Sequence, residues 1–165
     1  MKKFRIELKW GFLFFLSGLA WMVLEKYLGW HDLLIEQHAT YTLLYAPLAI
    51  FIYVIALWEK KKKTYGGRMT FLQGLLSGML ITLVVVVLTP LSQFLSHGLI
   101  SPAYFPNIIQ LTVNSGKMTL PEAEAYFNLM NYTKMSVFFA TGMGILTTVV
   151  VMIFMKSIPQ KDPSE

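Results

Sequence analysis

The sequence contains no cysteine among its 165 residues, and only 14% of its residues are charged. The absence of cysteine excludes disulfides, thiolate metal sites, cysteine nucleophiles and acyl-cysteine anchors. Hydrophobic residues make up 55% of the chain, which is too apolar for a soluble domain of this length. The chain therefore has the size of one domain and the composition of a membrane protein.

Enzyme motifs are also missing from the sequence. It has no glycine-rich phosphate loop, no Gly-x-Ser-x-Gly elbow and no His-Glu-x-x-His pair. The net charge of +5 could indicate a nucleic-acid partner, but the basic residues lie at the boundaries of apolar stretches rather than on an aromatic-studded face. The sequence therefore predicts no catalytic activity, no cofactor and no nucleic-acid binding.

Four apolar stretches divide the chain, at about residues 10–28, 41–58, 71–93 and 135–155. Each has close to the ~20 residues that a helix needs to cross the hydrocarbon core of a bilayer. The pattern predicts an all-α, polytopic membrane protein with four transmembrane helices in a single membrane domain over residues 1–156. A short polar tail, residues 157–165, is predicted to be disordered.

The basic residues indicate which way the spans run. With the N-terminus in the cytoplasm, 11 of the 14 Lys and Arg residues fall on the inner side, and only Lys26, Lys117 and Lys134 fall outside. This asymmetry is typical of a small polytopic protein with both termini cytoplasmic.

The long outer connection between the third and fourth spans predicts an extracytoplasmic helical hairpin at about residues 101–131. Ser101 is placed to cap a first helix that Gly116 ends. Thr119 and Glu122 fit a capping box that opens a second helix. We expect this second helix to continue directly into the fourth span.

The candidate functional residues are polar groups at or near the outer boundary. An ionisable residue within a span is costly and often functional, although Glu25 could also be a boundary anchor that reaches water. All three histidines fall on the outer side, but no pair has a strong metal-ligand spacing, so no metal site is predicted. The candidates are Glu25, His31, His38, Gln93 and His97.

Two rows of small residues predict close helix packing. Small side chains at four-residue steps allow helix backbones to approach each other in a membrane. Packing within the bundle is the favoured interpretation, and the alternative is that one row drives oligomerisation. The residues are Gly74, Gly78, Ser136, Ala140, Gly144 and Thr148.

Two classes of function are open. The first is a non-enzymatic accessory or interaction protein that contacts another membrane protein, with the lipid bilayer as its surroundings. The second is a small transporter or channel, formed as a homo-oligomer, with polar groups at its outer mouth. The middle of the predicted spans contains no acid, base or amide, which favours the first class.

Several short motifs resemble those of a known family. They are Glu7-x-Lys9-Trp10-Gly11, Leu24-Glu25-Lys26, His31-Asp32, His38-Ala39-Thr40-Tyr41, Met69-Thr70-x-x-Gln73-Gly74-x-x-Ser77-Gly78, Pro90-Leu91-Ser92-Gln93 and Gly116-Lys117-Met118-Thr119-x-x-Glu122-Ala123. With the four-span layout, the chain resembles the domain-of-unknown-function 4199 family of small bacterial inner-membrane proteins. The resemblance implies four helices and residence in the bacterial cytoplasmic membrane, and it brings no activity, substrate or catalytic residue.

Overall fold

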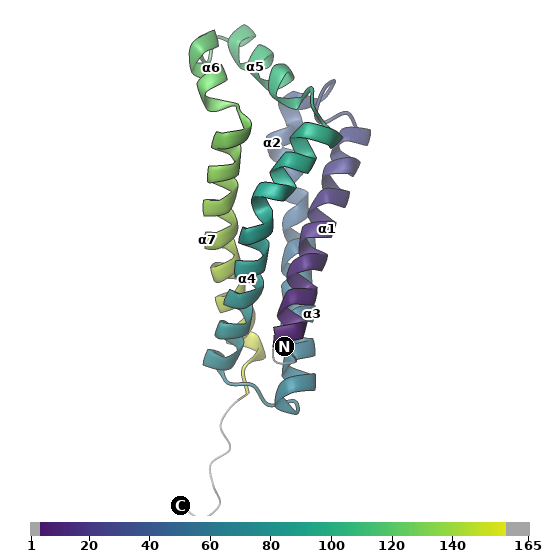
Figure 1. Ribbon diagram of the computed structural model, residues 1–165, viewed down its shortest axis with the longest axis vertical. Coiled ribbons are helices and arrows are strands. Elements are labelled where there is room, and N and C mark those ends of the chain that lie inside the picture. The colour runs from purple at the N-terminus through teal and green to yellow at the C-terminus, as the bar shows by residue number, and fades with distance from the viewer. Residues whose placement is uncertain (1–3, 158–165) are drawn as a thin grey trace, which may run out of the picture.

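The computed structural model describes residues 4–157, and every regular element in that range is helical. Four long helices run side by side in an elongated bundle, and two short helices lie across one end of it (Figure 1). The long helices are α1 (Arg5–Tyr27), α3 (Tyr45–Tyr65), α4 (Phe71–Phe94) and α7 (Leu129–Met155). The tail predicted to be disordered lies outside the described residues, apart from Ser157, whose N–H donates to the Met69 carbonyl at 2.9 Å.

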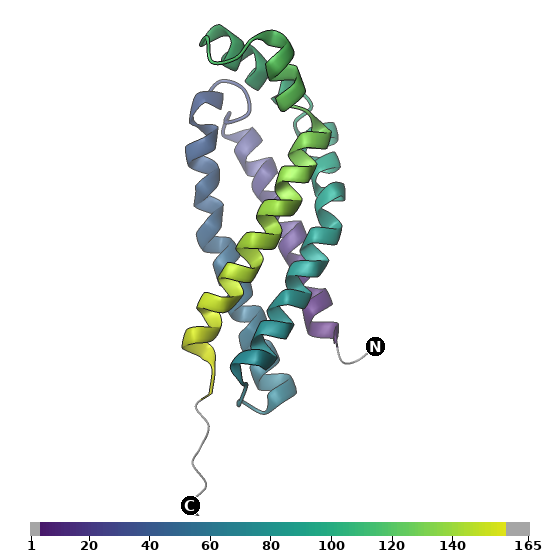
Figure 2. The same ribbon diagram turned by 90° about the vertical axis from the view of Figure 1, so that its left-hand side faces the viewer.

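The bundle has two different ends. At the basic end, which carries Lys60–Lys63 and Arg68, α1 begins, α7 ends and α3 turns into α4 (Figures 1 and 2). At the opposite end, the hairpin end, lie α5 (Tyr104–Asn114) and α6 (Leu120–Tyr126).

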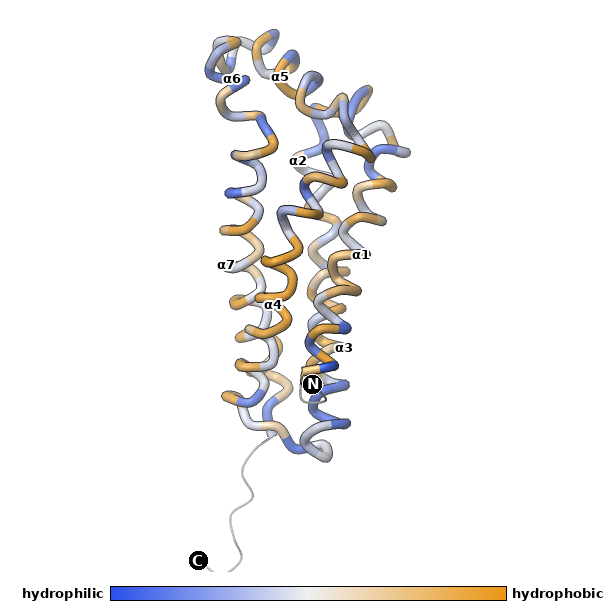
Figure 3. The backbone as a smooth tube through the Cα atoms, viewed as in Figure 1, coloured by the Kyte–Doolittle hydropathy of each residue, from blue (hydrophilic) through white to orange (hydrophobic). Residues whose placement is uncertain are grey.

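The four long helices are apolar enough to cross a membrane. Hydrophobic residues dominate their middle portions (Figure 3), and large apolar side chains such as Phe138 and Phe154 are exposed on the outside of the bundle. All four long helices carry large exposed apolar side chains, an arrangement that is favourable in lipid surroundings. The predicted all-α architecture with four membrane-spanning helices is confirmed.

The second long helix is displaced along the chain from the predicted stretch of residues 41–58. It is α3, which begins at Tyr45, so Pro47 lies in its first turn, where a missing backbone N–H is tolerated. Its C-terminal part continues through Lys60–Lys63 because lysine is a good helix former. Gly66, at φ 58°, then ends the helix in the left-handed conformation.

Short helical turns fill the connections at the hairpin end. Before α3 come η2 (Ile35–Gln37), α2 (His38–Tyr41) and η3 (Thr42–Leu44). After α4 comes η4 (Leu95–Ile100), a π-helical segment that follows Pro90. Proline removes a backbone donor, and π-helical turns are frequent at functional sites.

The predicted small residues lie where α4 and α7 cross. A Cβ on Gly74 would overlap the Met152 side chain, and one on Gly78 would overlap Thr148. The two helix backbones therefore approach each other so closely at these glycines that no larger side chain fits between them. Further along α7, Ser136 accepts a hydrogen bond from Gln93, and Ala140 is half-buried.

Replacing Gly144 by leucine is expected to destabilise the bundle by about 1–3 kcal/mol or more, because the new side chain would overlap Thr82 and Tyr53. Gly142 on the same helix is the matched control, since a Cβ there meets no atom within 4 Å. Thermal unfolding in detergent would show a lowered midpoint for Gly144→Leu and an unchanged or raised one for Gly142→Leu. Equal effects of the two substitutions would contradict this packing.

A buried ion pair joins α1 to α3 at the basic end. Glu7 Oε1 lies 2.7 Å from Lys60 Nζ, and the Glu7 side chain is 2% exposed. The sequence predicts for Lys60 only a place among the basic residues at the membrane boundary, and not this pairing. Nearer the middle of the bundle, Tyr53 and Thr82 share a hydrogen bond of 2.8 Å between their hydroxyls.

The hairpin differs from the prediction at both of its junctions. The first helix begins at Tyr104, and the Ser101 hydroxyl contacts His31 instead of capping that helix. The second helix does not continue into the fourth span, because Asn128 accepts from the Asn131 N–H at 2.9 Å and starts α7 separately.

The predicted capping box is present at the start of α6. The Thr119 N–H donates to the Glu122 carboxylate at 2.8 Å. The hydrogen bonds from Thr119 hold the pKa of the Glu122 carboxyl below its usual range.

Candidate functional site

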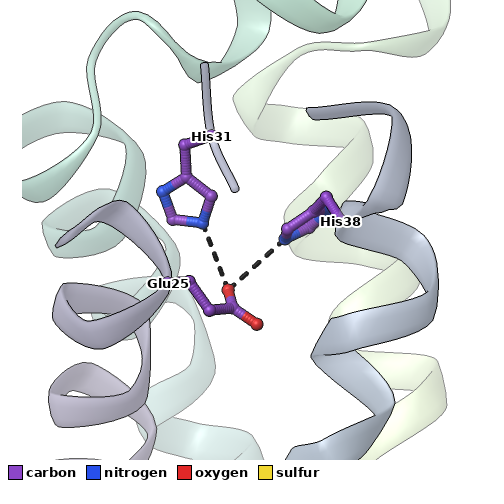
Figure 4. A group of neighbouring side chains, drawn as sticks. All are labelled: Glu25, His31 and His38. Atoms are coloured by element: carbon purple, nitrogen blue, oxygen red, sulfur yellow. Dashed lines mark hydrogen bonds and ion pairs between the residues drawn. The ribbon is translucent and has the colours of Figure 1, made fainter. Parts of the chain in front are cut away.

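Three side chains converge at the hairpin end of the bundle and form what we term the hairpin-end centre: Glu25, His31 and His38. Glu25 comes from the last part of α1, His31 from the turn after it, and His38 from the start of α2 (Figure 4). Glu25 Oε2 lies 3.1 Å from His31 Nε2 and 3.3 Å from His38 Nε2. One carboxylate oxygen therefore faces two imidazole nitrogens.

The centre is nearly closed to solvent. The side chains of Glu25 and His31 are 2% and 1% exposed, whereas that of His38 is 17% exposed. Glu25 therefore does not reach water as a boundary anchor would. A buried carboxylate is costly unless charge and hydrogen bonds compensate it.

The remaining polar atoms of the three side chains are held by partners outside the centre. Trp21 Nε1 donates to Glu25 Oε1 at 2.7 Å. Ser101 Oγ lies 3.0 Å from His31 Nδ1, and the Tyr104 hydroxyl lies 3.3 Å from His38 Nδ1. These contacts fix the orientation of each ring and leave both Nε2 atoms directed at Glu25.

The turn after α1 explains how His31 reaches back over Glu25. Gly29 adopts φ 76°, a conformation that favours glycine, and its carbonyl accepts from the Leu34 N–H at 2.8 Å. The Trp30 N–H also donates to the Glu25 carbonyl at 3.0 Å. The chain thus folds tightly onto the end of its own helix, which turns the His31 side chain inwards.

Tyr104 lies between the centre and α7. Tyr104 is buried. Its hydroxyl oxygen lies 3.3 Å from the Tyr132 hydroxyl oxygen and also contacts His38. Burial, together with the neighbouring Tyr132, raises the pKa of the Tyr104 hydroxyl. The hydroxyl therefore stays protonated and can both donate and accept a hydrogen bond.

The structure brings together three of the five candidate polar residues and leaves two outside the centre. His97 packs its ring against Tyr104, with centroids 4.9 Å apart, but within residues 4–157 it forms no hydrogen bond with Glu25, His31 or His38. Among the described residues its buried Nδ1 has no hydrogen-bond partner. Gln93 lies deeper and bridges α4 to α7 through the Ser136 hydroxyl at 3.0 Å.

Sequence reasoning missed the residues that orient the centre: Trp21, Ser101 and Tyr104. Trp21 precedes Glu25 by one helical turn, so the spacing could have indicated this contact. Ser101 and Tyr104 are separated from their histidines by 70 and 66 positions, and nothing local marks them as partners.

The chemistry available to the centre is that of one carboxylate and two imidazoles. The three potential ligand atoms all lie within 4.8 Å of one another, so Glu25, His31 and His38 could hold a metal ion. Without an ion, the same atoms form a hydrogen-bonded cluster in which both Nε2–H groups donate to the carboxylate.

Comparison with known proteins identifies a family. A family model described as "Protein of unknown function (DUF4199)" matches residues 9–157, which include every residue of the centre. No curated protein and no solved structure matches the chain.

Proposed function

Since this chain belongs to the DUF4199 family, whose function is unknown, we propose a role from its own geometry: it is a non-enzymatic accessory protein of the membrane that acts through its helical hairpin. In this role the hairpin-end centre sets the position of the hairpin. The hairpin then contacts another membrane protein.

The observation that carries this proposal is the set of contacts by which the hairpin is attached. Ser101 and Tyr104, at its beginning, bond to the two histidines of the centre. Asn107 on α5 donates from Nδ2 to the His31 carbonyl at 2.9 Å. These contacts support a coupling in which a change in the centre alters the position of the hairpin.

We place the protein in the bacterial cytoplasmic membrane with both termini in the cytoplasm. The lysine run Lys60–Lys63 lies at the basic end, together with the start of α1 and the end of α7. The positive-inside rule then puts the hairpin and the hairpin-end centre on the extracytoplasmic side.

The alternative, a small oligomeric transporter or channel, needs a polar route between the two ends. The core around Tyr53 is instead packed with Ala56, Ile81 and the rings of Trp10 and Phe14. An open groove of about 380 Å³ between α4 and α7 has mainly apolar walls, formed by Leu76, Met79, Leu80, Thr82, Leu83, Val86, Thr141 and Ile145. These features favour the accessory role.

A photo-crosslinking amino acid at Leu120, an exposed residue of α6, tests the accessory role in native membranes. We expect it to give a reproducible product with one other membrane protein, because the hairpin is the proposed contact surface. The same group at Leu72, an exposed residue at the basic end of α4, is the positional control and should not give that product.

The product should also depend on the centre. Glu25→Gln is expected to lower its yield, whereas Glu36→Gln, at an exposed acid in the same connection, should leave it unchanged. Products formed only between copies of this chain would contradict the accessory role and support the oligomeric alternative. A product that is insensitive to Glu25→Gln would separate the hairpin contact from the centre and contradict the proposed coupling.

A further inference from the structure

We infer that the hairpin-end centre is a binding site for a divalent transition-metal ion of the Zn²⁺ class, held by Glu25 Oε2, His31 Nε2 and His38 Nε2. This inference deepens the proposed function, because it names the ligand of the centre that positions the hairpin. It rests on the arrangement of the three side chains and of the groups that orient them.

Two of the three distances between ligand atoms, those from Glu25 Oε2 to each Nε2, are close to the spacing around a tetrahedral ion. At metal–ligand distances of about 2.0–2.1 Å, neighbouring ligand atoms of a tetrahedral Zn²⁺ lie about 3.3–3.4 Å apart. Glu25 Oε2 lies 3.1 Å from His31 Nε2 and 3.3 Å from His38 Nε2. All three ligand atoms lie within 4.8 Å of one another, so rotations of the side chains would bring them around one ion.

The donor types select among metals. Two imidazole nitrogens and one carboxylate oxygen suit Zn²⁺ and its transition-metal neighbours. Ca²⁺ and Mg²⁺ prefer shells of six or more oxygen ligands, which these residues do not supply. Three protein ligands leave a fourth position for water, and the partly exposed His38 marks the side from which an ion and water would enter.

The groups around the ligands fit both the metal-free and the metal-bound state. Without metal, each Nδ1 can accept from the hydroxyl beside it, Ser101 for His31 and Tyr104 for His38. With metal on Nε2, the proton moves to Nδ1, which then donates to the same hydroxyl. A hydroxyl can fill both roles, and metal-binding histidines usually have such a partner.

Charge supplies an independent reason. The Glu25 carboxylate is 2% exposed, and within residues 4–157 its ion pairs are to the two histidines alone. The neighbouring Lys26 extends away to the Ile100 carbonyl. Buried charges in proteins are paired or coordinate metals, and a divalent ion would compensate this carboxylate directly.

The test is Zn²⁺ binding to the full-length protein in detergent, purified through a tag that contains no histidine and stripped with a chelator. Isothermal titration with zinc chloride should give one ion per chain. Glu25→Gln and His38→Gln should each weaken binding by at least about tenfold, and the orienting variant Ser101→Ala by about tenfold. His97→Gln is the matched control, because His97 lies beside Tyr104 but outside the centre.

A second readout reports geometry rather than affinity. Co²⁺ titrated into the wild-type protein should give the intense visible absorption of a tetrahedral site, which His38→Gln abolishes and His97→Gln retains. The absence of Zn²⁺ binding by the folded wild-type protein, or equal losses in His97→Gln and His38→Gln, would overturn the metal site. Neither result would affect the proposed coupling of the centre to the hairpin, because hydrogen exchange in the presence of chelator tests that coupling without metal.

Discussion

Replacing Lys60 by methionine is expected to destabilise the folded protein by about 3–5 kcal/mol, because it leaves the Glu7 carboxylate buried without its partner. Glu7 Oε1 lies 2.7 Å from Lys60 Nζ, and both side chains are almost fully enclosed between the helices. Removal of one member of such a pair costs much more than the pair itself contributes.

The double variant separates the pair from simple loss of packing. Glu7→Leu combined with Lys60→Met should recover most of the lost stability, because two apolar side chains need no charge compensation. Lys63→Met is the control: Lys63 is 70% exposed and pairs with Glu59 at the surface, so its removal should have little effect. Reversible unfolding by SDS in mixed micelles gives the three values. A double variant that is less stable than Lys60→Met alone would contradict the buried pair.

The fold could be predicted from the sequence because its determinants are local. A stretch of about twenty apolar residues specifies a membrane helix almost regardless of the rest of the chain. Capping chemistry is local as well: the capping box of Thr119 and Glu122 could be predicted from residues three positions apart. The family resemblance was likewise confirmed, by a match over residues 9–157.

The pairing of distant polar residues could not be predicted. Lys60 was indistinguishable in sequence from the three exposed or half-buried lysines that follow it, and only the angular position of Lys60 on α3 turns it towards Glu7. Glu25 and the histidines were identified as candidates, but the spacing of His31 and His38 gave no ligand signal. The tight turn at Gly29 brings Glu25, His31 and His38 together. Their contact is tertiary, so the spacing of the histidines along the chain did not indicate it.

Replacing Glu25 by leucine is expected to release the hairpin from the bundle. Glu25 is the shared acceptor for Trp21, His31 and His38, so its loss leaves three buried or partly buried donors without their partner. Each such loss costs about 1–3 kcal/mol. The two imidazoles would lose their orientation, and with it their bonds to Ser101 and Tyr104.

The effect should be local. The crossing of α4 and α7 lies away from the centre, at Gly78 and Thr148, and its close packing does not involve Glu25. Amides in these helices therefore serve as an internal reference for folding. Glu36→Leu is the matched control, because Glu36 is an exposed acid in the same connection.

Hydrogen–deuterium exchange of residues 101–126, followed by mass spectrometry in detergent with chelator present, tests the coupling of centre and hairpin most directly. For Glu25→Leu we expect exchange in this segment to accelerate by about a hundredfold, which corresponds to about 3 kcal/mol of lost local stability, while α4 and α7 remain protected. Glu36→Leu should exchange like the wild-type protein. If the hairpin of Glu25→Leu stayed as protected as that of the wild-type protein, the centre would not hold the hairpin and the proposed function would be contradicted.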